Sequence, residues 1–247
     1  LDFTPKLVCA QVELNVGVFE WIEGKKPGSS NPGAIQSALQ FTRALKELYD
    51  RSDQSFPEAS EACLSVFELV SQIENRLLAL DSIEHQELQA FLRGRLWPLW
   101  KGLLARQSQW WSDVAKDSTL PLEKQTLSPS DFGFHNAIER EDGRILFNDF
   151  EYFGRDDPVK LIADFLWHPG MRLTPMEKEQ WIRGTFRIFA ADSGLVARLR
   201  NTWAYYGVRW ALIILNSFRL LGRTEDRKQG SSQIDDNFRS AQLQKAS

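Results

Sequence analysis

The chain has 247 residues, of which 43% are hydrophobic and 26% charged, and its formal net charge is −3. A chain of this kind can bury one large core, and its charge gives no general attraction to nucleic acid or to an anionic membrane. The two cysteines lie far apart with no Cys-x-x-Cys pair, so the sequence suggests neither a zinc site nor a disulfide framework and fits a reducing, cytoplasmic compartment.

The chain begins with two candidate strands and then becomes helical. Residues 4–11 and 12–22 read as two strands. Apolar residues then recur at helical spacing in three segments. They predict helices over residues 32–50, 57–80 and 84–116.

The third predicted helix carries a proline and several tryptophans. Pro98 should kink it, because proline removes a backbone hydrogen bond. One interpretation of the tryptophans is an aromatic cage for a quaternary ammonium group. Their helical spacing favours core packing instead. These residues are Trp97, Trp100, Trp110 and Trp111.

Side chains suited to phosphoryl transfer follow these helices. Asp131 and Asn136 are five residues apart, and Asp149 comes thirteen residues later, after a predicted hairpin with an Asp142-Gly143 turn. Because the ends of a hairpin are neighbours, Asn136 and Asp149 should lie close together. Their oxygens are the ligands that Mg²⁺ prefers, and Asp131 could take the proton of an acceptor hydroxyl. Each residue alone is better explained as part of a turn, but together they favour the phosphoryl-transfer site.

The remainder of the chain is predicted to be mainly helical. Asp157 followed by Pro158 is typical of a helix N-terminus, and that helix should run to about Trp167. Two more helices are expected over residues 175–193 and 195–221. From residue 223 onward the chain is polar, so we expect a mobile tail.

The segment from Ser128 to Asp164 resembles the catalytic core of the aminoglycoside phosphotransferase and choline kinase group, small-molecule kinases distantly related to protein kinases. That family has a loop of the form H-G-D-x-x-x-x-N, then a hairpin, an I-D-F/W-E element and a later G-D-P element. The corresponding residues here are Asp131 and Asn136, then Asp149-Phe-Glu151, then Asp157-Pro158. Segments 18–24 and 206–216 are also similar to the family's hinge and late helix, so the resemblance covers nearly all of the chain to about residue 222.

The chain departs from the family pattern at two places. Pro129 stands where the family usually has a histidine, so we expect something other than an imidazole to brace the loop. His135 could reach a phosphate or the acceptor, although ordering its own loop is the favoured role. No glycine-rich loop, strand lysine or paired helix glutamate is identifiable, so we expect an N-terminally incomplete chain.

The resemblance implies an α+β, protein-kinase-like fold with a mostly helical C-terminal lobe and a small remnant of the N-terminal β lobe. Residues 1–23 would be the last strands of the N-terminal lobe and the hinge. Residues 24–222 would be the helical catalytic lobe, and residues 223–247 the tail.

The resemblance also implies a phosphotransferase that uses ATP, with GTP as an alternative, together with Mg²⁺. Asp131 would be the catalytic base, and Asn136 and Asp149 would hold the metal ion. The nucleotide base would lie against the backbone of the hinge residues. These are Glu20, Trp21 and Ile22.

The acceptor would be a hydroxyl of a small molecule, with a sugar or an amino alcohol favoured over an aminoglycoside. Neither the acceptor nor the oligomeric state follows from the sequence, and no nucleic acid or membrane partner is expected. Two alternatives stay open. Pro129 and the missing lobe suggest a nucleotide-binding pseudokinase or regulatory module, and the tryptophan-rich helices suggest a helical interaction domain.

Overall fold

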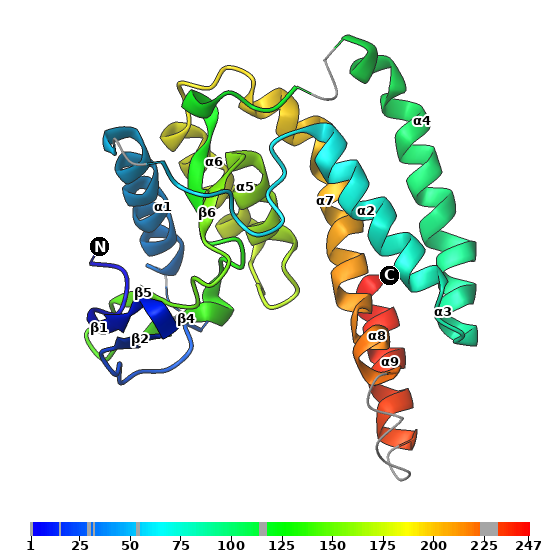
Figure 1. Cartoon of the computed structure of the whole chain (residues 1–247), viewed down its shortest axis with the longest axis horizontal. Helices are drawn as coiled ribbons and strands as arrows, with labels where there is room; N and C mark the ends of the chain where they lie inside the picture. Colours follow the sequence, from blue (N-terminus) through cyan, green and yellow to red (C-terminus); the bar gives the residue numbers. More distant parts are fainter. Residues whose placement is uncertain are drawn as a thin grey trace. The chain divides into compact units, whose positions relative to one another are not determined.

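The computed structural model describes residues 2–14, 16–28, 31, 33–52, 55–113, 118–222 and 232–247, without the side chains of 108–113, 220–222 and 232–236. The chain forms two compact units. Unit 1 comprises Leu1–Ala62 and Pro121–Val196, and unit 2 comprises Cys63–Leu120 and Ala197–Ser247. Figure 1 labels the elements of both.

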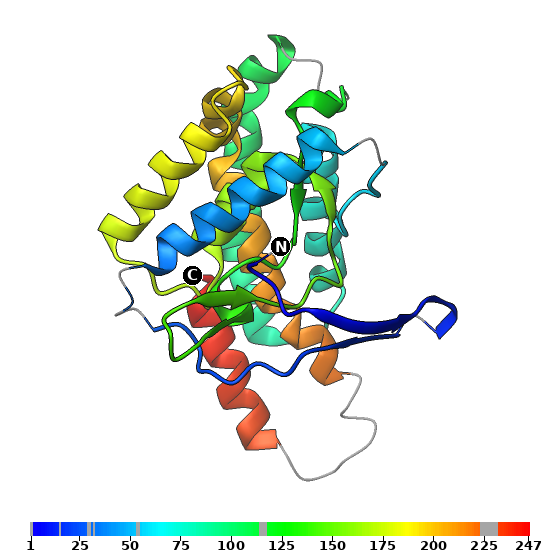
Figure 2. The same ribbon diagram turned by 90° about the vertical axis from the view of Figure 1, so that its left-hand side faces the viewer.

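Unit 1 begins with an exposed antiparallel hairpin. Strand β1 (Leu7–Gln11) pairs with β2 (Val16–Phe19), and the 3₁₀ turn η1 (Val12–Leu14) separates them. Both strands are solvent-exposed along their whole length, and Figure 2 shows the hairpin extending from the rest of unit 1. Two strands were predicted here, and the second is shorter than expected because the turn occupies its first residues.

The hairpin predicted between Asn136 and Asp149 is confirmed. Strand β4 (Ala137–Glu139) pairs antiparallel with β5 (Ile145–Phe147). Gly143 has a φ of +80°, which glycine adopts without strain, and its N–H donates to the Arg140 carbonyl at 3.0 Å. The local pattern was sufficient to predict this element because an Asp-Gly pair fits a tight turn.

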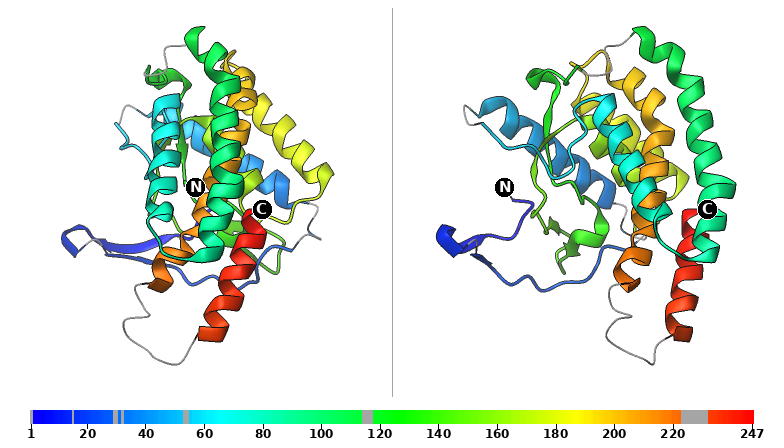
Figure 3. Two further views of the ribbon diagram at one scale, coloured as in Figure 1. Left: turned by 90° about the vertical axis from the view of Figure 1, so that its right-hand side faces the viewer. Right: turned by 45° about the vertical axis from the view of Figure 1, so that its right-hand side comes forward.

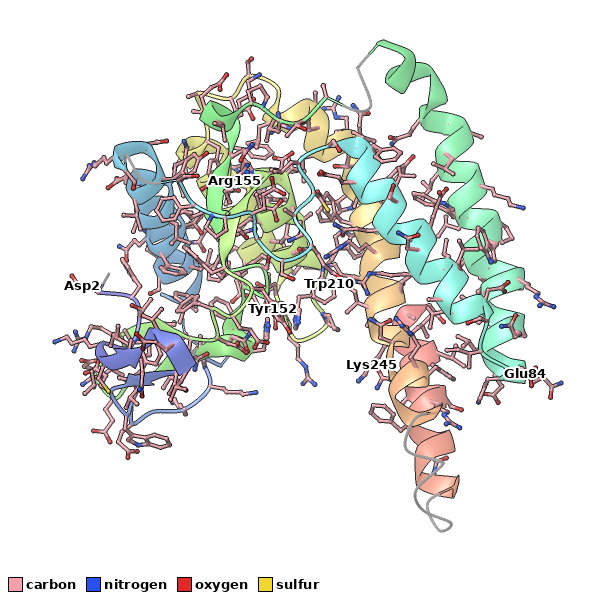
Figure 4. The ribbon with its side chains drawn as sticks, in the orientation of Figure 1. Asp2, Glu84, Tyr152, Arg155, Trp210 and Lys245 are labelled. Carbon is pink, nitrogen blue, oxygen red and sulfur yellow. The ribbon has the colours of Figure 1, made fainter. Side chains whose placement is uncertain are left out.

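A second pair of short strands brackets the segment that carries the candidate site. Strand β3 (Thr126–Ser128) is antiparallel to β6 (Gly154–Asp156). The backbone of Arg155, labelled in Figure 4, donates to the Pro57 carbonyl at 2.8 Å and accepts from the Ala59 N–H at 3.0 Å. Gly154 permits this approach, since a Cβ there would lie 2.4 Å from the Ala59 nitrogen.

These contacts correct one helix prediction. Residues 57–80 were expected to be helical throughout, but the segment around Pro57–Ala59 lies against β6 instead. Helix α2 (Val66–Asp81) begins later, after Ser65, where Ser65 and Glu68 form a capping box. This Ser-x-x-Glu signal was present in the sequence and marks the true start.

The core of unit 1 is aromatic and lies between three helices. Helices α1 (Ala34–Arg51) and α6 (Pro175–Ile188) pack side by side, as Figure 2 shows, while α5 (Pro158–Trp167) is almost wholly buried. Asp157 caps α5 by accepting from the Val159 N–H at 2.9 Å, which confirms the predicted helix start. The rings that pack together in this core are Phe41, Phe132, Phe147, Phe165 and Trp181.

Unit 2 is helical. It contains α2, α3 (Gln86–Phe91), a π-helical turn η2 (Leu92–Leu96), α4 (Trp97–Asp113), most of α7 (Leu195–Leu215), α8 (Ser217–Gly222) and α9 (Ser232–Ala246). Figure 3 shows α2, α4 and α7 running side by side. Trp100 packs on Tyr205 with ring centroids 4.8 Å apart, and the Arg209 Nε atom donates to Gln72 at 3.1 Å.

Two predictions for unit 2 need qualification. The long third helix is divided by η2, which directly precedes Trp97 and Pro98. Trp100 is 1% exposed, which supports core packing, whereas the side chains of Trp110 and Trp111 lie outside the described residues.

The C-terminal segment also differs from the expectation. A mobile tail was expected from residue 223; residues 223–231 lie outside the described part of the chain, but α9 covers 232–246. The lobe boundaries expected at residues 23 and 222 do not coincide with the two compact units and stay a prediction. Within the described ranges, the structure has no helix with enough length and apolar character to cross a bilayer.

Candidate functional site

The loop that carries Asp131 begins where β3 ends and is held on both sides. Ser130 has a left-handed backbone with φ +65°, and its hydroxyl donates to the Ser60 carbonyl at 3.2 Å. Downstream, the 3₁₀ turn η4 (Phe134–Asn136) closes the loop. Between these points Phe132 is buried in the aromatic core, with its ring 5.0 Å from that of Phe147. Asp131 is therefore fixed at the edge of a rigid core.

The carboxylate of Asp131 is half-buried and engaged at both oxygens. Its Oδ1 atom lies 2.9 Å from Nε2 of His135, and its Oδ2 atom accepts a hydrogen bond from Nδ2 of Asn136 at 3.1 Å. The hydrogen bond from His135 lowers the pKa of Asp131, helped by the charges of both nearby histidines and by Asn136 and opposed by burial. At neutral pH this side chain is an anion with 36% exposure.

Asn136 has its amide oriented by Asp131. Its Nδ2 atom donates to the Asp131 carbonyl at 3.0 Å as well as to the carboxylate. Because nitrogen and oxygen are the two branches of the amide, the oxygen of Asn136 faces away from Asp131. An amide oxygen oriented in this way can accept a hard cation.

Asp149 lies at the other end of the hairpin. The Asn148 N–H donates to the Asn136 carbonyl at 3.0 Å, so the two ends of the hairpin are joined directly. Asp149 is exposed and has a φ of +65°, a conformation that aspartate tolerates better than most residues. The prediction that Asn136 and Asp149 lie at neighbouring positions agrees with this geometry.

A pocket of about 600 Å³ brings Asp149 together with the predicted hinge. It is lined on one side by Glu20, Trp21 and Ile22 and on the other by Asn148 to Glu151. Within the described residues, Trp21 and Ile22 make no backbone hydrogen bond, so their peptide groups are available to a ligand. Neither Asp131 nor Asn136 is among the residues that line this pocket.

Tyr152, labelled in Figure 4, follows directly after Glu151 in the segment that begins with Asp149. The pKa of its hydroxyl is raised, mainly by a hydrogen bond to Glu151 and by the charge of that residue. The charges of Asp149 and Asp131 make smaller contributions in the same direction.

A buried ion cluster supports the loop from within unit 1. Nζ of Lys160 lies 2.9 Å from Oδ2 of Asp156 and 3.5 Å from Oδ2 of Asp164, and all three side chains are at most 5% exposed. The same ammonium group reaches the hydroxyl of Ser130 at 3.4 Å. Lys160 thus connects α5 to the residue that precedes Asp131.

Sequence reasoning missed two of these contributors. His168 follows α5 and approaches Asp131 from a segment that has no fixed spacing to the loop, so no motif pointed to it. Lys160 left only a partial signal: Lys160 and Asp164 are four residues apart and lie on one face of α5, whereas Asp156 belongs to β6, where helical spacing does not apply.

The structure has an α+β, protein-kinase-like fold, and unit 1 places an Asp, an Asn and a second Asp around the β4–β5 hairpin. Solved structures share this fold. The superposition with a choline/ethanolamine kinase family protein from Mesorhizobium loti covers 99% of this chain and 74% of that protein's chain, with a TM-score of 0.57 and 17% sequence identity. Choline kinase from Streptococcus pneumoniae matches 99% and 75%, with a TM-score of 0.55 and 15% identity. Ethanolamine kinase from Plasmodium vivax matches 99% and 67%, with a TM-score of 0.52 and 12% identity.

These likenesses establish the fold. The fold class expected from the sequence is confirmed, with a helical region and a small β remnant. The resemblance to the choline kinase group agrees with the solved structures. No family model matches the sequence, and no curated protein matches it either.

Proposed function

We propose that this protein is a small-molecule kinase that transfers the terminal phosphoryl group of ATP to a hydroxyl. One observation carries the proposal. In a choline-kinase-like fold, Asp131 and Asn136 are hydrogen-bonded to each other, and the hairpin connects them to Asp149 at the mouth of a hinge-lined pocket. These residue types match the needs of phosphoryl transfer, which depends on positioning and on charge neutralisation.

The nucleotide would occupy the pocket between the hinge and Asp149. Its volume of about 600 Å³ lies within the usual range for small-molecule sites. The adenine would bond to the peptide groups of Trp21 and Ile22, and Glu20 would flank it. The choline kinase from Streptococcus pneumoniae has also been solved with AMP, which supports an adenine nucleotide. No observation favours GTP.

The donor set of the site fits magnesium. Asn136 offers an amide oxygen directed away from Asp131, and Asp149 offers an exposed carboxylate, both hard oxygen ligands. When bound, the ion would neutralise negative charge on the phosphate oxygens. The protein's own part is to hold these two oxygens at the two joined ends of one hairpin.

Asp131 would act on the acceptor. Its depressed pKa keeps it ionised, so it orients the acceptor hydroxyl by accepting a hydrogen bond from it. As the new bond forms between the acceptor oxygen and the γ-phosphorus, the bond from that phosphorus to the β,γ-bridging oxygen breaks and ADP leaves. The hydroxyl proton passes to Asp131.

For the acceptor we propose a small hydroxylated molecule, with amino alcohols tested first and sugars next. The support is that structures resembling this chain are named as choline and ethanolamine kinases. The pseudokinase alternative is not favoured by any observation of the site, because Asp131, Asn136 and Asp149 are all in accessible positions.

The test is a phosphoryl-transfer assay with the purified protein. Magnesium, γ-labelled ATP and a panel of choline, ethanolamine, sugars and aminoglycosides would be supplied, and labelled products separated. We expect transfer to one acceptor class, reduced about 10²- to 10⁴-fold by Asp131→Asn. Equal rates for Asp131→Asn and the wild type would remove the proposed base. Nucleotide binding without transfer to any acceptor would favour the pseudokinase.

A further inference from the structure

Two histidines converge on the same oxygen of Asp131. The rings of His135 and His168 stack in parallel, with centroids 3.7 Å apart and an interplanar angle of 5°. The Nε2 atom of His135 is 2.9 Å from Oδ1 of Asp131, and Nε2 of His168 is 3.6 Å from it. Both rings are mostly buried, with side-chain exposures of 17% and 15%.

The hydrogen bonds fix which ring nitrogens carry protons. Nδ1 of His168 accepts the Gly170 N–H at 3.0 Å, so in the neutral ring the proton sits on Nε2, which faces Asp131. Burial, with the nearby His135, lowers the pKa of His168 to about 4, so this ring is neutral at pH 7. Nε2 of His135 must be a donor as well, because an ionised carboxylate only accepts.

The turn that carries His168 also contacts the Asp131 loop at Phe134. The Met171 N–H donates to the His168 carbonyl at 2.9 Å, which closes the turn. The sulfur of Met171 accepts the Phe134 N–H at 3.1 Å. Gly133 allows this fit, since a Cβ there would lie 2.7 Å from Nδ1 of His135 and 2.8 Å from the Met171 sulfur.

We propose that His135 and His168 act as a stacked pair of positioning residues, which present two N–H groups to Oδ1 of Asp131 and set its orientation toward the acceptor. The inference rests on the proposed function, in which Asp131 meets the acceptor hydroxyl. Asn136 holds the other oxygen, so the carboxylate is fixed from both sides. Because Pro129 stands two residues before Asp131, we expected a group other than an imidazole to brace the loop. That expectation is wrong, since the imidazoles of His135 and His168 are the groups that contact the carboxylate.

A transition metal is the competing use of the same three residues. One atom each of Asp131, His135 and His168 lie within 4.8 Å of one another, close enough to share an ion. A metal needs an unprotonated nitrogen, and a ligating histidine usually donates with its other nitrogen. His168 shows the opposite arrangement, because its other nitrogen accepts from Gly170. The geometry therefore favours positioning over metal binding.

The first test needs no turnover. The chain has three histidines, so ¹⁵N–¹H long-range correlation spectra can be assigned with His85→Asn and single variants of the other two. We expect both His135 and His168 as Nε2–H rings at pH 7. A Nδ1–H tautomer of His168, or metal-bound shifts of both rings on adding one equivalent of zinc, would overturn the proposal. This result stands even if no acceptor is ever phosphorylated.

The second test uses paired variants in the transfer assay. Gln places an N–H near the position of Nε2, whereas Leu fills similar space without a donor. We expect His168→Leu to lower kcat about tenfold to a hundredfold with little change in KM for ATP, and His168→Gln to recover most of it. The same contrast is expected for His135, and the double Leu variant should lose less than the product of the two single effects.

Two outcomes of the second test would refute the pair. In one, His168→Leu retains the wild-type kcat. In the other, His168→Gln is as slow as His168→Leu while both melt at the wild-type temperature. His85→Asn is the control, because His85 caps α3 in unit 2 and should leave kcat unchanged.

Discussion

The buried ammonium of Lys160 offers the sharpest test of how unit 1 is stabilised. It lies between two carboxylates, 2.9 Å from that of Asp156 and 3.5 Å from that of Asp164. In Lys160→Met the aliphatic part of the side chain remains, but the two buried acids lose the ammonium group that lies between them. Removing one partner of a buried ion pair typically costs about 3–5 kcal/mol, a large fraction of the roughly 5–15 kcal/mol that stabilises a domain.

Urea unfolding at pH 7, followed by tryptophan fluorescence, would measure this loss. Hydrogen exchange of α5 amides would show whether the opening includes that helix. The matched control is Arg183→Met, which removes an exposed pair with Glu179 on α6 and should cost no more than about 0.5 kcal/mol. Adding Asp164→Asn to Lys160→Met should restore part of the stability, because it removes one of the two buried negative charges that face the lost ammonium group.

The reasoning fails if Lys160→Met lowers the free energy of unfolding by less than about 1 kcal/mol, because removing a buried cation from between two acids should cost more than that. It also fails if the added Asp164→Asn change destabilises the protein further.

Three further predictions concern pH, packing and metal. The pKa of His168 is about 4 in the folded protein and about 6.5 in the unfolded chain, so the unfolded chain takes up the proton first as the pH falls. The contribution of neutral His168 to the free energy of unfolding is therefore complete above about pH 6.5. It declines toward pH 4, by at most about 3 kcal/mol. Stability curves should become flatter in His168→Gln and stay unchanged in His85→Asn. In thermal unfolding, Gly154→Ala should destabilise the protein by about 1–3 kcal/mol, because the added Cβ would meet the Ala59 backbone. The control is Gly102→Ala in α4, which has open space around it and should be neutral or stabilising. Asp149→Asn should weaken calorimetric binding of magnesium–ADP about tenfold or more and leave metal-free ADP binding intact, and equal losses for both forms would contradict its role as a ligand.

Local patterns predicted the elements on which the site is built. Asp142-Gly143 specified the β4–β5 hairpin, and Asp157-Pro158 specified the start of α5, because each is a turn or cap whose geometry depends on adjacent residues. The positions of Asn136 and Asp149 at joined ends followed from the hairpin alone.

Long-range contacts were beyond local patterns. Residues 57–62 contain Pro at the first position and then Glu and Ala, which fit the start of a helix. The backbone of Arg155 in β6 instead pairs with this segment, and this tertiary contact overrides the local preference. His168 reaches Asp131 only because the turn after α5 folds back over the loop, and no spacing in the sequence encodes that return.

The left-handed backbone at Asp149 and Ser130 restricts what can replace them. Such a backbone conformation costs most residues roughly 1 kcal/mol of conformational free energy and costs glycine almost nothing. At position 130 glycine would also delete the hydroxyl that bonds the Ser60 carbonyl and the Lys160 ammonium, so the relief of strain is offset there. At position 149 the side chain is exposed, and glycine would relax the backbone while deleting the carboxylate proposed to hold magnesium. Laboratory selection for heat resistance alone should therefore favour glycine at position 149, at the expense of the proposed metal site.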